Sequence, residues 1–173
     1  MKPTFAPFPQ AFLLVLVLAM VCLPPIRAFA APHPVERVIV YKNQKVMQLL
    51  SGNKVIRSYQ VALGRNPLGR KQKAGDCRTP EGTYIIDCHK KGSKFYKALH
   101  ISYPNKQDLA VARNHGQAPG GDIMIHGLPK GFEDLADFHF RKNWTKGCIA
   151  VNNIEMDEIW QMVADGTPII IKP

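Results

Sequence analysis

Cys148 lies in a segment that could display a reactive thiol. It follows Gly147 and separates the polar stretch Trp144–Gly147 from the apolar run Ile149–Val151, which suits a sharp bend before a strand. Gly147 permits backbone conformations that a side chain would block, and it lets the amides of Gly147 and Cys148 approach a substrate carbonyl. A free thiol ionises only slightly near neutral pH, so nucleophilic chemistry requires a neighbouring base or cation. The alternative is a small buried apolar residue, a common place for an isolated cysteine.

His126 supplies a base if the fold brings it near Cys148. It ends the apolar run Asp122–Ile125 and precedes Gly127, as expected for a residue held rigidly at a sheet edge. A structural histidine is the alternative interpretation. A zinc site built from Cys148, His126 and His139 has neither CxxC nor HxxxH spacing, so we expect no metal and no other cofactor.

The order of these motifs resembles the L,D-transpeptidase catalytic domain (YkuD-type). That family has a His followed, some residues later, by Ser/Thr-x-Gly-Cys, which is matched here by His126-Gly127 and by Thr145–Cys148. Further matching segments are Gly75-Asp76 with Arg78–Tyr84, His100–Asn105, Gly120–Gly127 and Gly166–Ile169. The resemblance covers nearly all of the chain after residue 30 and makes Cys148 the expected nucleophile.

For the chemistry, this resemblance implies cysteine acyl transfer on peptidoglycan stem peptides. Cys148 would attack the carbonyl between meso-diaminopimelate and the terminal D-alanine of a tetrapeptide donor and form a thioester, while His126 takes and returns the proton. The amides of Gly147 and Cys148, together with that of Lys146, would hold the oxyanion, and Thr145 would orient the turn. The products would be 3-3 cross-links, exchanged amines or an anchored wall protein.

Two positions depart from the family pattern. Lys146 replaces a second His that often precedes Gly-Cys, and Ala150 replaces an Arg or Asn that commonly lies two residues after the Cys. The contact to the substrate carboxylate is therefore either missing or supplied by Arg141 or Lys142. Gly127, beside the candidate base, is also expected to contact substrate.

Two other functions stay open at this stage. With water as the acceptor, the same thioester chemistry would give an L,D-carboxypeptidase or an amidase that acts on wall peptides. A protein without catalysis would be a wall-binding module, but the presence of both Cys148 and His126 argues against it.

The elements that must position these residues are mainly β-strands. Runs rich in Val, Ile and Tyr between turn residues favour a meander of antiparallel strands over residues 35–41, 45–50 and 54–62. Further strands are expected over residues 82–88, 99–102, 122–126 and 168–171. Asn152 precedes Glu155 by three positions and starts the clearest helix. Its apolar face comprises Met156, Ile159, Trp160 and Val163. We therefore predict one mainly β domain of mixed sheets with short helices, a loop over 63–80 and a short helix within 129–143.

Residues 1–30 have the layout of a secretory signal peptide. Lys2 precedes the apolar run Ala11–Leu23, and Ala28-Phe29-Ala30 offers a small-x-small cleavage site. The run is too short for a comfortable membrane span of about 20 residues, so an uncleaved anchor is the less favoured alternative. Residues 31–173 would then form an exported catalytic domain in the periplasm or cell wall, which contacts a membrane only before cleavage.

Charge narrows the class of partner. The formal net charge of the 173-residue chain is +10, and loss of Lys2 and Arg27 with the signal peptide lowers it to +8. A basic exported domain favours an anionic wall polymer, although a solvated basic surface without a partner has the same composition. Nucleic acid is excluded as a partner by the compartment and by the lack of any recognition motif.

The two cysteines outside the Gly-Cys motif are expected to be unpaired. If Thr79–Gly82 forms a tight turn, Cys77 faces Tyr84, and Cys88 lies about 13 Å further along the strand. A disulfide requires Cα atoms within about 7 Å of each other. We therefore predict free thiols at Cys77 and Cys88, with Cys148 as the functional cysteine.

Overall fold

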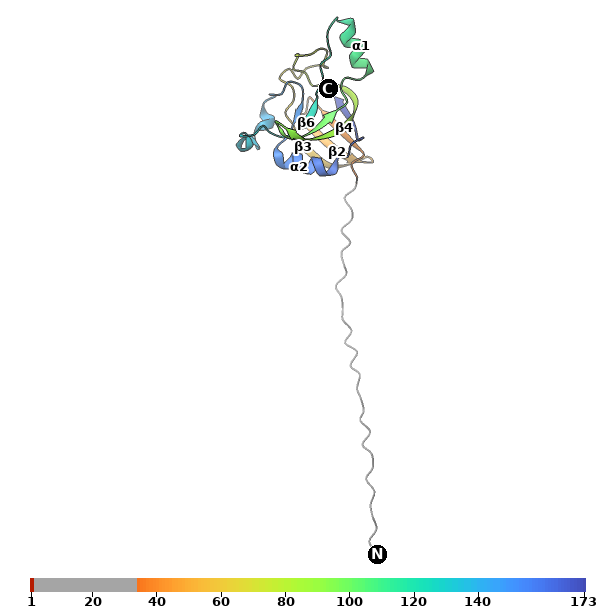
Figure 1. Ribbon diagram of the computed structural model, residues 1–173, viewed down its shortest axis with the longest axis vertical. Coiled ribbons are helices and arrows are strands. Elements are labelled where there is room, and N and C mark those ends of the chain that lie inside the picture. Colours follow the sequence, from red (N-terminus) through yellow and green to blue (C-terminus); the bar gives the residue numbers. More distant parts are fainter. Residues whose placement is uncertain (2–33) are drawn as a thin grey trace. The chain divides into compact units, whose positions relative to one another are not determined.

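Eight strands build the sheet of this protein. In chain order they are β1 (Arg37–Tyr41), β2 (Val46–Ser51), β3 (Lys54–Gln60), β4 (Gly82–Ser93), β5 (Tyr96–Ile101), β6 (Met124–His126), β7 (Ile149–Ala150) and β8 (Pro168–Lys172). The computed structural model describes Met1 and residues 34–173. It shows the strands in the spatial order β3-β2-β1-β8-β4-β5-β6-β7 (Figure 1).

The sheet is mixed, as predicted. β1 pairs with β8 in parallel and β6 pairs with β7 in parallel, while the remaining neighbours are antiparallel. Val38, Ile39 and Val40 of β1, which lies between β2 and β8, are all buried, so both faces of this strand are covered by other parts of the domain. Charged Lys54 and Arg57 lie on β3, the edge strand, where they discourage pairing with another chain.

Two α-helices lie at opposite ends of the folded domain, α1 (Lys106–Asn114) and α2 (Asn153–Met162) (Figure 1). The predicted capping box starts α2, since the Asn152 side chain accepts from the Glu155 amide and the Glu155 carboxylate accepts from the Asn152 amide. Met156 and Ile159 of α2 are fully buried in the main apolar cluster. The amphipathic helix after Cys148 is therefore confirmed.

Two features differ from the sequence prediction, which contained no helix at α1 and ended the strand of β4 at Cys88, five residues too early. The segment 129–143 contains the expected short helical structure in the form of two 3-10 turns, Glu133–Leu135 and His139–Arg141. Neither turn has a side-chain cap, and each ends after three residues. Without a cap or a repeated apolar face, this segment has little to propagate an α-helix.

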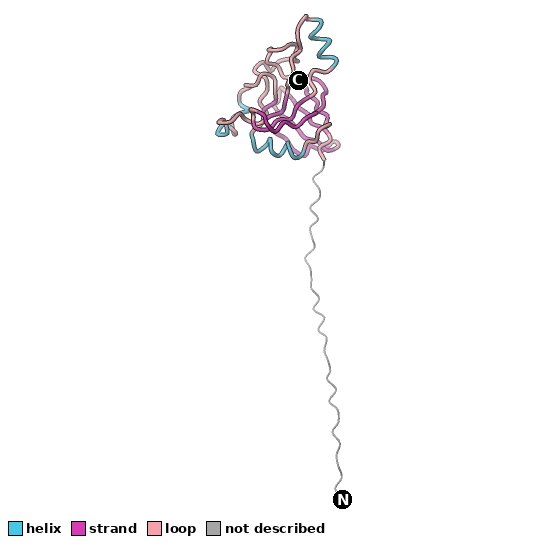
Figure 2. The backbone as a smooth tube through the Cα atoms, in the orientation of Figure 1, coloured by secondary structure: helices cyan, strands magenta, loops and turns pink. Residues whose placement is uncertain are grey.

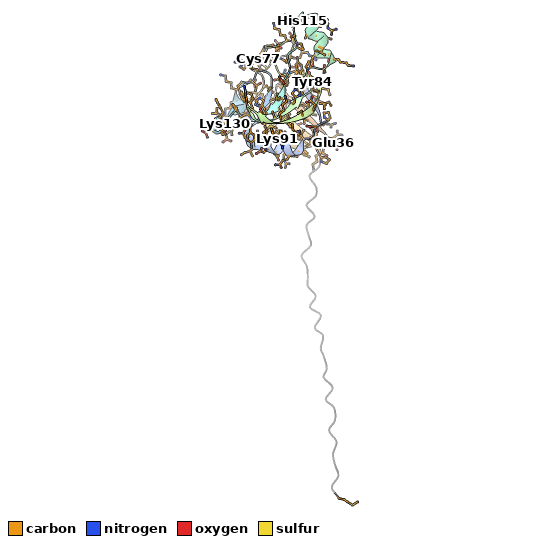
Figure 3. The ribbon with its side chains drawn as sticks, viewed as in Figure 1. Glu36, Cys77, Tyr84, Lys91, His115 and Lys130 are labelled. Atoms are coloured by element: carbon orange, nitrogen blue, oxygen red, sulfur yellow. The ribbon has the colours of Figure 1, made fainter. Side chains whose placement is uncertain are left out.

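The predicted tight turn before β4 is also wrong. Gly82 is the first residue of β4 and faces Ile171 of β8, so Cys77 has no place opposite Tyr84. Figure 3 shows Cys77 among the upper loops, whereas Lys91, on the same strand as Cys88, lies near the lower edge. The thiols of Cys77 and Cys88 are both free, as predicted. The reason differs from the predicted one, since Cys77 lies in a loop and not on a strand opposite Tyr84.

The loops gather in the half of the domain that carries α1, away from α2 (Figure 2). The predicted signal peptide lies outside the described residues. Within the described part of the chain, none of the helices combines the length and the apolar character that a membrane crossing requires.

Candidate active site

The pairing of β6 with β7 places Cys148 and His126 on the same face of the sheet. Ile125 faces Ile149 across the two strands, and both side chains enter the core. Side chains alternate along a strand, so His126 and Cys148, each next to one of these isoleucines, point to the opposite face. Cys148 is level with Met124, two residues before His126, which puts the two Cα atoms about 8 Å apart.

The imidazole of His126 is buried and held in one tautomer. Its side chain packs against the rings of Phe95, at 4.5 Å between centroids, and of Trp144, at 5.7 Å. Nδ1 lies 2.7 Å from the carbonyl oxygen of Gly127, which can only accept, so Nδ1 carries the proton. Burial lowers the pKa of His126 to about 4, although the bond to Gly127 opposes the shift. At neutral pH the ring is therefore neutral, with a free lone pair on Nε2.

The thiol of Cys148 is partly exposed and is bonded within the loop before β6. Its Sγ donates to the carbonyl oxygen of Asp122 at 3.5 Å and accepts from the backbone N–H of Met124. Burial raises the pKa of Cys148 and the charge of Asp122 adds to the rise, while the Met124 amide and the charge of Lys71 oppose it. The thiol and the imidazole are therefore both neutral at neutral pH, so a nucleophilic role for the sulfur would first require loss of the thiol proton.

Thr145 fixes the turn that presents the thiol. Its hydroxyl donates to the carbonyl oxygen of Cys148 at 2.7 Å and accepts from the amide of Gly147 at 3.1 Å. Its own backbone joins the segment that follows β3, since the Thr145 amide donates to Leu63 and its carbonyl accepts from Arg65. The side chain is 4% exposed, so the turn is anchored from the inside.

The bond to Thr145 corrects one expectation about the oxyanion. The Gly147 N–H is committed to the threonine hydroxyl, so it does not face the space above the thiol. Among the described residues, neither the Lys146 nor the Cys148 amide makes a hydrogen bond, and these two N–H groups are the available donors. The Lys146 side chain is exposed.

Gly147 is required by the close approach of the loop before β4. Its φ is +133°, and a Cβ there would lie 2.8 Å from the carbonyl oxygen of Arg78. We expect Gly147→Ala to lower the free energy of unfolding by about 2 kcal/mol, because it adds a backbone clash to an unfavourable φ. Urea unfolding measures this, with Gly121→Ala as the control, since a Cβ at Gly121 meets no atom within 4 Å. Equal stability of the two variants would contradict this packing.

Two other predicted positions shape the surroundings of His126. A Cβ on Gly127 would lie 2.5 Å from Oδ1 of Asn153, whose side chain accepts from the Leu128 amide at 2.8 Å. Gly127 thus lets α2 close against the end of β6. Ala150 is fully buried and exchanges backbone hydrogen bonds with Ala62, so a long polar side chain has no room there.

Arg141 and Lys142 lie on the segment between the two motifs, and in the described residues no contact joins either of them to Cys148 or His126. The guanidinium of Arg141 stacks on Phe138 at 4.5 Å. Lys142 borders an apolar cavity of about 360 Å³ whose lining includes Trp144, and the Trp144 ring lies 5.7 Å from the ring of His126. Because the lining is apolar, charged groups are expected to lie outside this cavity.

The sequence prediction missed the residues that enclose the thiol and the ring. Phe95 and Trp144 exclude water from His126, and the Asp122 carbonyl orients the thiol. Asp122 has a positive φ of 53°, which is uncommon outside glycine. Its place directly after Gly120-Gly121 was the available signal of an irregular backbone. In residues 34–173 no cluster of three or more His, Cys, Asp or Glu side chains is placed to hold a metal.

The comparison with known families identifies this fold and motif set. The sequence profile of YkuD, described as the L,D-transpeptidase catalytic domain, matches residues 36–171. The chain belongs to the L,D-transpeptidase family. The match includes every strand, both helices and both motifs described above.

Individual relatives of this L,D-transpeptidase domain are distant. YafK of Escherichia coli is 32% identical over 130 residues, covering 72% of this chain and 45% of YafK. YqjB of Bacillus subtilis is 28% identical over 135 residues, covering 78% of this chain and 69% of YqjB. The crystal structure of Pgp2, a helical cell shape determining protein from Campylobacter jejuni, aligns with a TM-score of 0.61 and 26% identity, covering 78% of this chain and 46% of Pgp2. The chain thus spans less than half the length of YafK and Pgp2.

Proposed function

We propose that this protein is an exported cysteine acyltransferase that acts on peptidoglycan stem peptides through a thioester on Cys148. The supporting observation is the tautomer of His126, which lies on the same face of the sheet as the thiol. Its Nδ1 proton is held by the Gly127 carbonyl, and its unprotonated Nε2 is left to accept a proton. A thiol and a neutral imidazole on one face of a sheet make the pair that a cysteine nucleophile requires.

The acylation step begins with proton transfer. His126 Nε2 takes the thiol proton, and the Cys148 sulfur attacks the carbonyl carbon between diaminopimelate and the terminal D-alanine. The oxyanion is held by the Lys146 and Cys148 amides. When the C–N bond breaks, His126 returns the proton to the departing D-alanine amine, which leaves a thioester on Cys148.

The second step reverses these roles. An acceptor amine attacks the thioester carbonyl, His126 takes the proton of that amine, and the thiol is restored as the C–S bond breaks. The acceptor is a stem-peptide amine, a free D-amino acid or a protein lysine. With water in its place, the same site would be a hydrolase.

Product analysis of purified protein with tetrapeptide muropeptides tests this proposal. We expect cross-linked dimers, or D-amino acid exchange when a free D-amino acid is added, with the release of D-alanine. If tripeptides are the only products, the protein is a hydrolase and not a transferase. Intact tetrapeptides, with no covalent adduct on Cys148 after incubation with a carbapenem, would overturn the thioester proposal. A carbapenem is an informative probe because the family resemblance implies sensitivity to this class of acylating agent.

Export is the second part of the proposal. We propose that residues 1–30 are a signal peptide and that residues 31–173 are the exported catalytic domain. The support is the apolar run after Lys2 and the Ala28-Phe29-Ala30 site. The mass of the protein recovered from the periplasm or wall fraction tests it, because cleavage after Ala30 gives an N-terminus at Ala31.

A further inference from the structure

A buried ion pair lies in the loop between β3 and β4, and the chemistry above does not use it. Nζ of Lys71 is 2.8 Å from Oδ1 of Asp76, and the two side chains are 4% and 8% exposed. A buried ammonium loses its hydration, which is costly even beside a carboxylate. A loop lysine could extend into solvent instead, so its inward orientation calls for a physical reason.

Asp76 organises this loop around the lysine. Its Oδ2 accepts from the amides of Gln72 at 2.8 Å and Lys73 at 3.1 Å, and its Oδ1 accepts from the amide of Arg78 at 3.1 Å. Burial alone would raise the pKa of Asp76, but the bonds from Lys71 and the three amides outweigh it and lower the pKa. The carboxylate is therefore charged at neutral pH and fixes the position of Lys71.

The loop touches both parts of the candidate active site. On one side, the Arg78 carbonyl packs against Gly147, directly before the thiol residue. On the other, the Ala74 amide donates to Ala118 at 2.8 Å, and Cε of Lys71 lies 3.5 Å from where a Cβ of Gly120 would be. The latter segment leads to the Asp122 carbonyl that accepts from the thiol. The Lys71 side chain thus packs against the segment that leads to the thiol's acceptor, and the loop that carries it also packs against Gly147.

Two charges act on the sulfur, those of Asp122 in the loop before β6 and of Lys71. His126, at the end of β6, is neutral at neutral pH, and the side chain of Lys146 is exposed. The carboxylate of Asp122 is 81% exposed, and therefore screened by water, whereas the ammonium of Lys71 is buried. A buried charge acts through a lower effective dielectric than an exposed one.

We propose that Lys71, positioned by Asp76, is the cation that stabilises the Cys148 thiolate formed when His126 takes the proton. Lys71 does not touch the sulfur and acts through its charge alone. This inference rests on the proposed function, since it assigns a supporting residue to the same nucleophile. No bond to Lys71 forms or breaks.

The ionisation of Cys148 tests this proposal without any substrate. In a Cys77→Ser/Cys88→Ser background, the rate of alkylation by iodoacetamide is measured against pH. We expect Lys71→Met to raise the midpoint by about one pH unit, as loss of a nearby opposite charge does. Two control variants should leave the midpoint unchanged. Lys71→Arg keeps the charge, and Lys73→Met removes an exposed charge from the same loop.

Lys71→Arg separates charge from loop structure, because it keeps the cation and changes the shape of the side chain. Asp76→Asn removes the carboxylate that holds Lys71. It should therefore raise the midpoint as well, but by less than Lys71→Met, because a negative charge is lost at the same time. An unchanged midpoint in folded Lys71→Met, or an equal rise in Lys71→Arg and Lys71→Met, would overturn the proposal. If Lys71→Met does not fold, an unchanged midpoint in Asp76→Asn would overturn it.

This readout also separates two possible failures. The alkylation profile reports the thiol alone, so it can refute the role of Lys71 while muropeptide products still form. Conversely, a missing product with a normal profile would count against the proposed function and leave the Lys71 inference intact.

Discussion

Replacing Cys148 with alanine is expected to abolish product formation, by on the order of 10³-fold or more, while the fold is preserved. In the proposed mechanism the sulfur forms the thioester, so no other group in the site can substitute for it. The side chain is partly exposed and its bonds within the domain are weak ones to backbone atoms. Its loss should therefore change the free energy of unfolding by less than about 1 kcal/mol. Muropeptide turnover and urea unfolding, measured on the same preparation, check both parts.

Cys88→Ala is the matched control for this experiment. Cys88 is an exposed free thiol on β4 that donates only to the carbonyl oxygen of the neighbouring His89. This variant should keep full turnover and should still form a carbapenem adduct on Cys148. Turnover that survives Cys148→Ala would remove the thioester from the mechanism, whatever the stability of the variant.

The site was predictable to the extent that local patterns determine it. Ile125 and Ile149 mark the buried face of two strands, and the alternation of side chains then places His126 and Cys148 on the other face. The capping box at Asn152 likewise starts α2 where the sequence predicted it. Such features depend on neighbours two to four residues away, which a single sequence displays.

The features that sequence reasoning missed depend on distant partners. Helix α1 has few apolar residues. Asp108 of its capping box is buried, because its carboxylate accepts hydrogen bonds from Arg70 and from the Tyr84 hydroxyl. A capping box of Asn105 and Asp108 was present in the sequence, but no apolar face drew attention to it. The commitment of the Gly147 amide to Thr145 was also hidden, since it follows from the three-dimensional course of the turn.

His126→Gln should lower turnover by about 10²- to 10⁴-fold, the usual contribution of a positioned general base. Because burial lowers the pKa of His126 to about 4, the neutral base persists well below the ordinary range of histidine. The activity of the unmodified protein should therefore fall only as the pH drops through about 4. An acid limb near pH 6.5 would show that the imidazole ionises in contact with water and that the buried arrangement is wrong.

The same lowered pKa predicts how stability depends on pH. An unfolded chain protonates this histidine below about pH 6.5, whereas the folded protein resists until about pH 4, so acid favours the unfolded state within that window. The contribution is fully present above pH 6.5 and is lost as the pH falls to 4, by about 3 kcal/mol. Urea unfolding across this range should show a shallower pH dependence in His126→Gln than in His115→Gln, whose histidine is exposed. Identical slopes in the two variants would mean that His126 is hydrated in the folded state, and its role as a water-shielded base would then be lost.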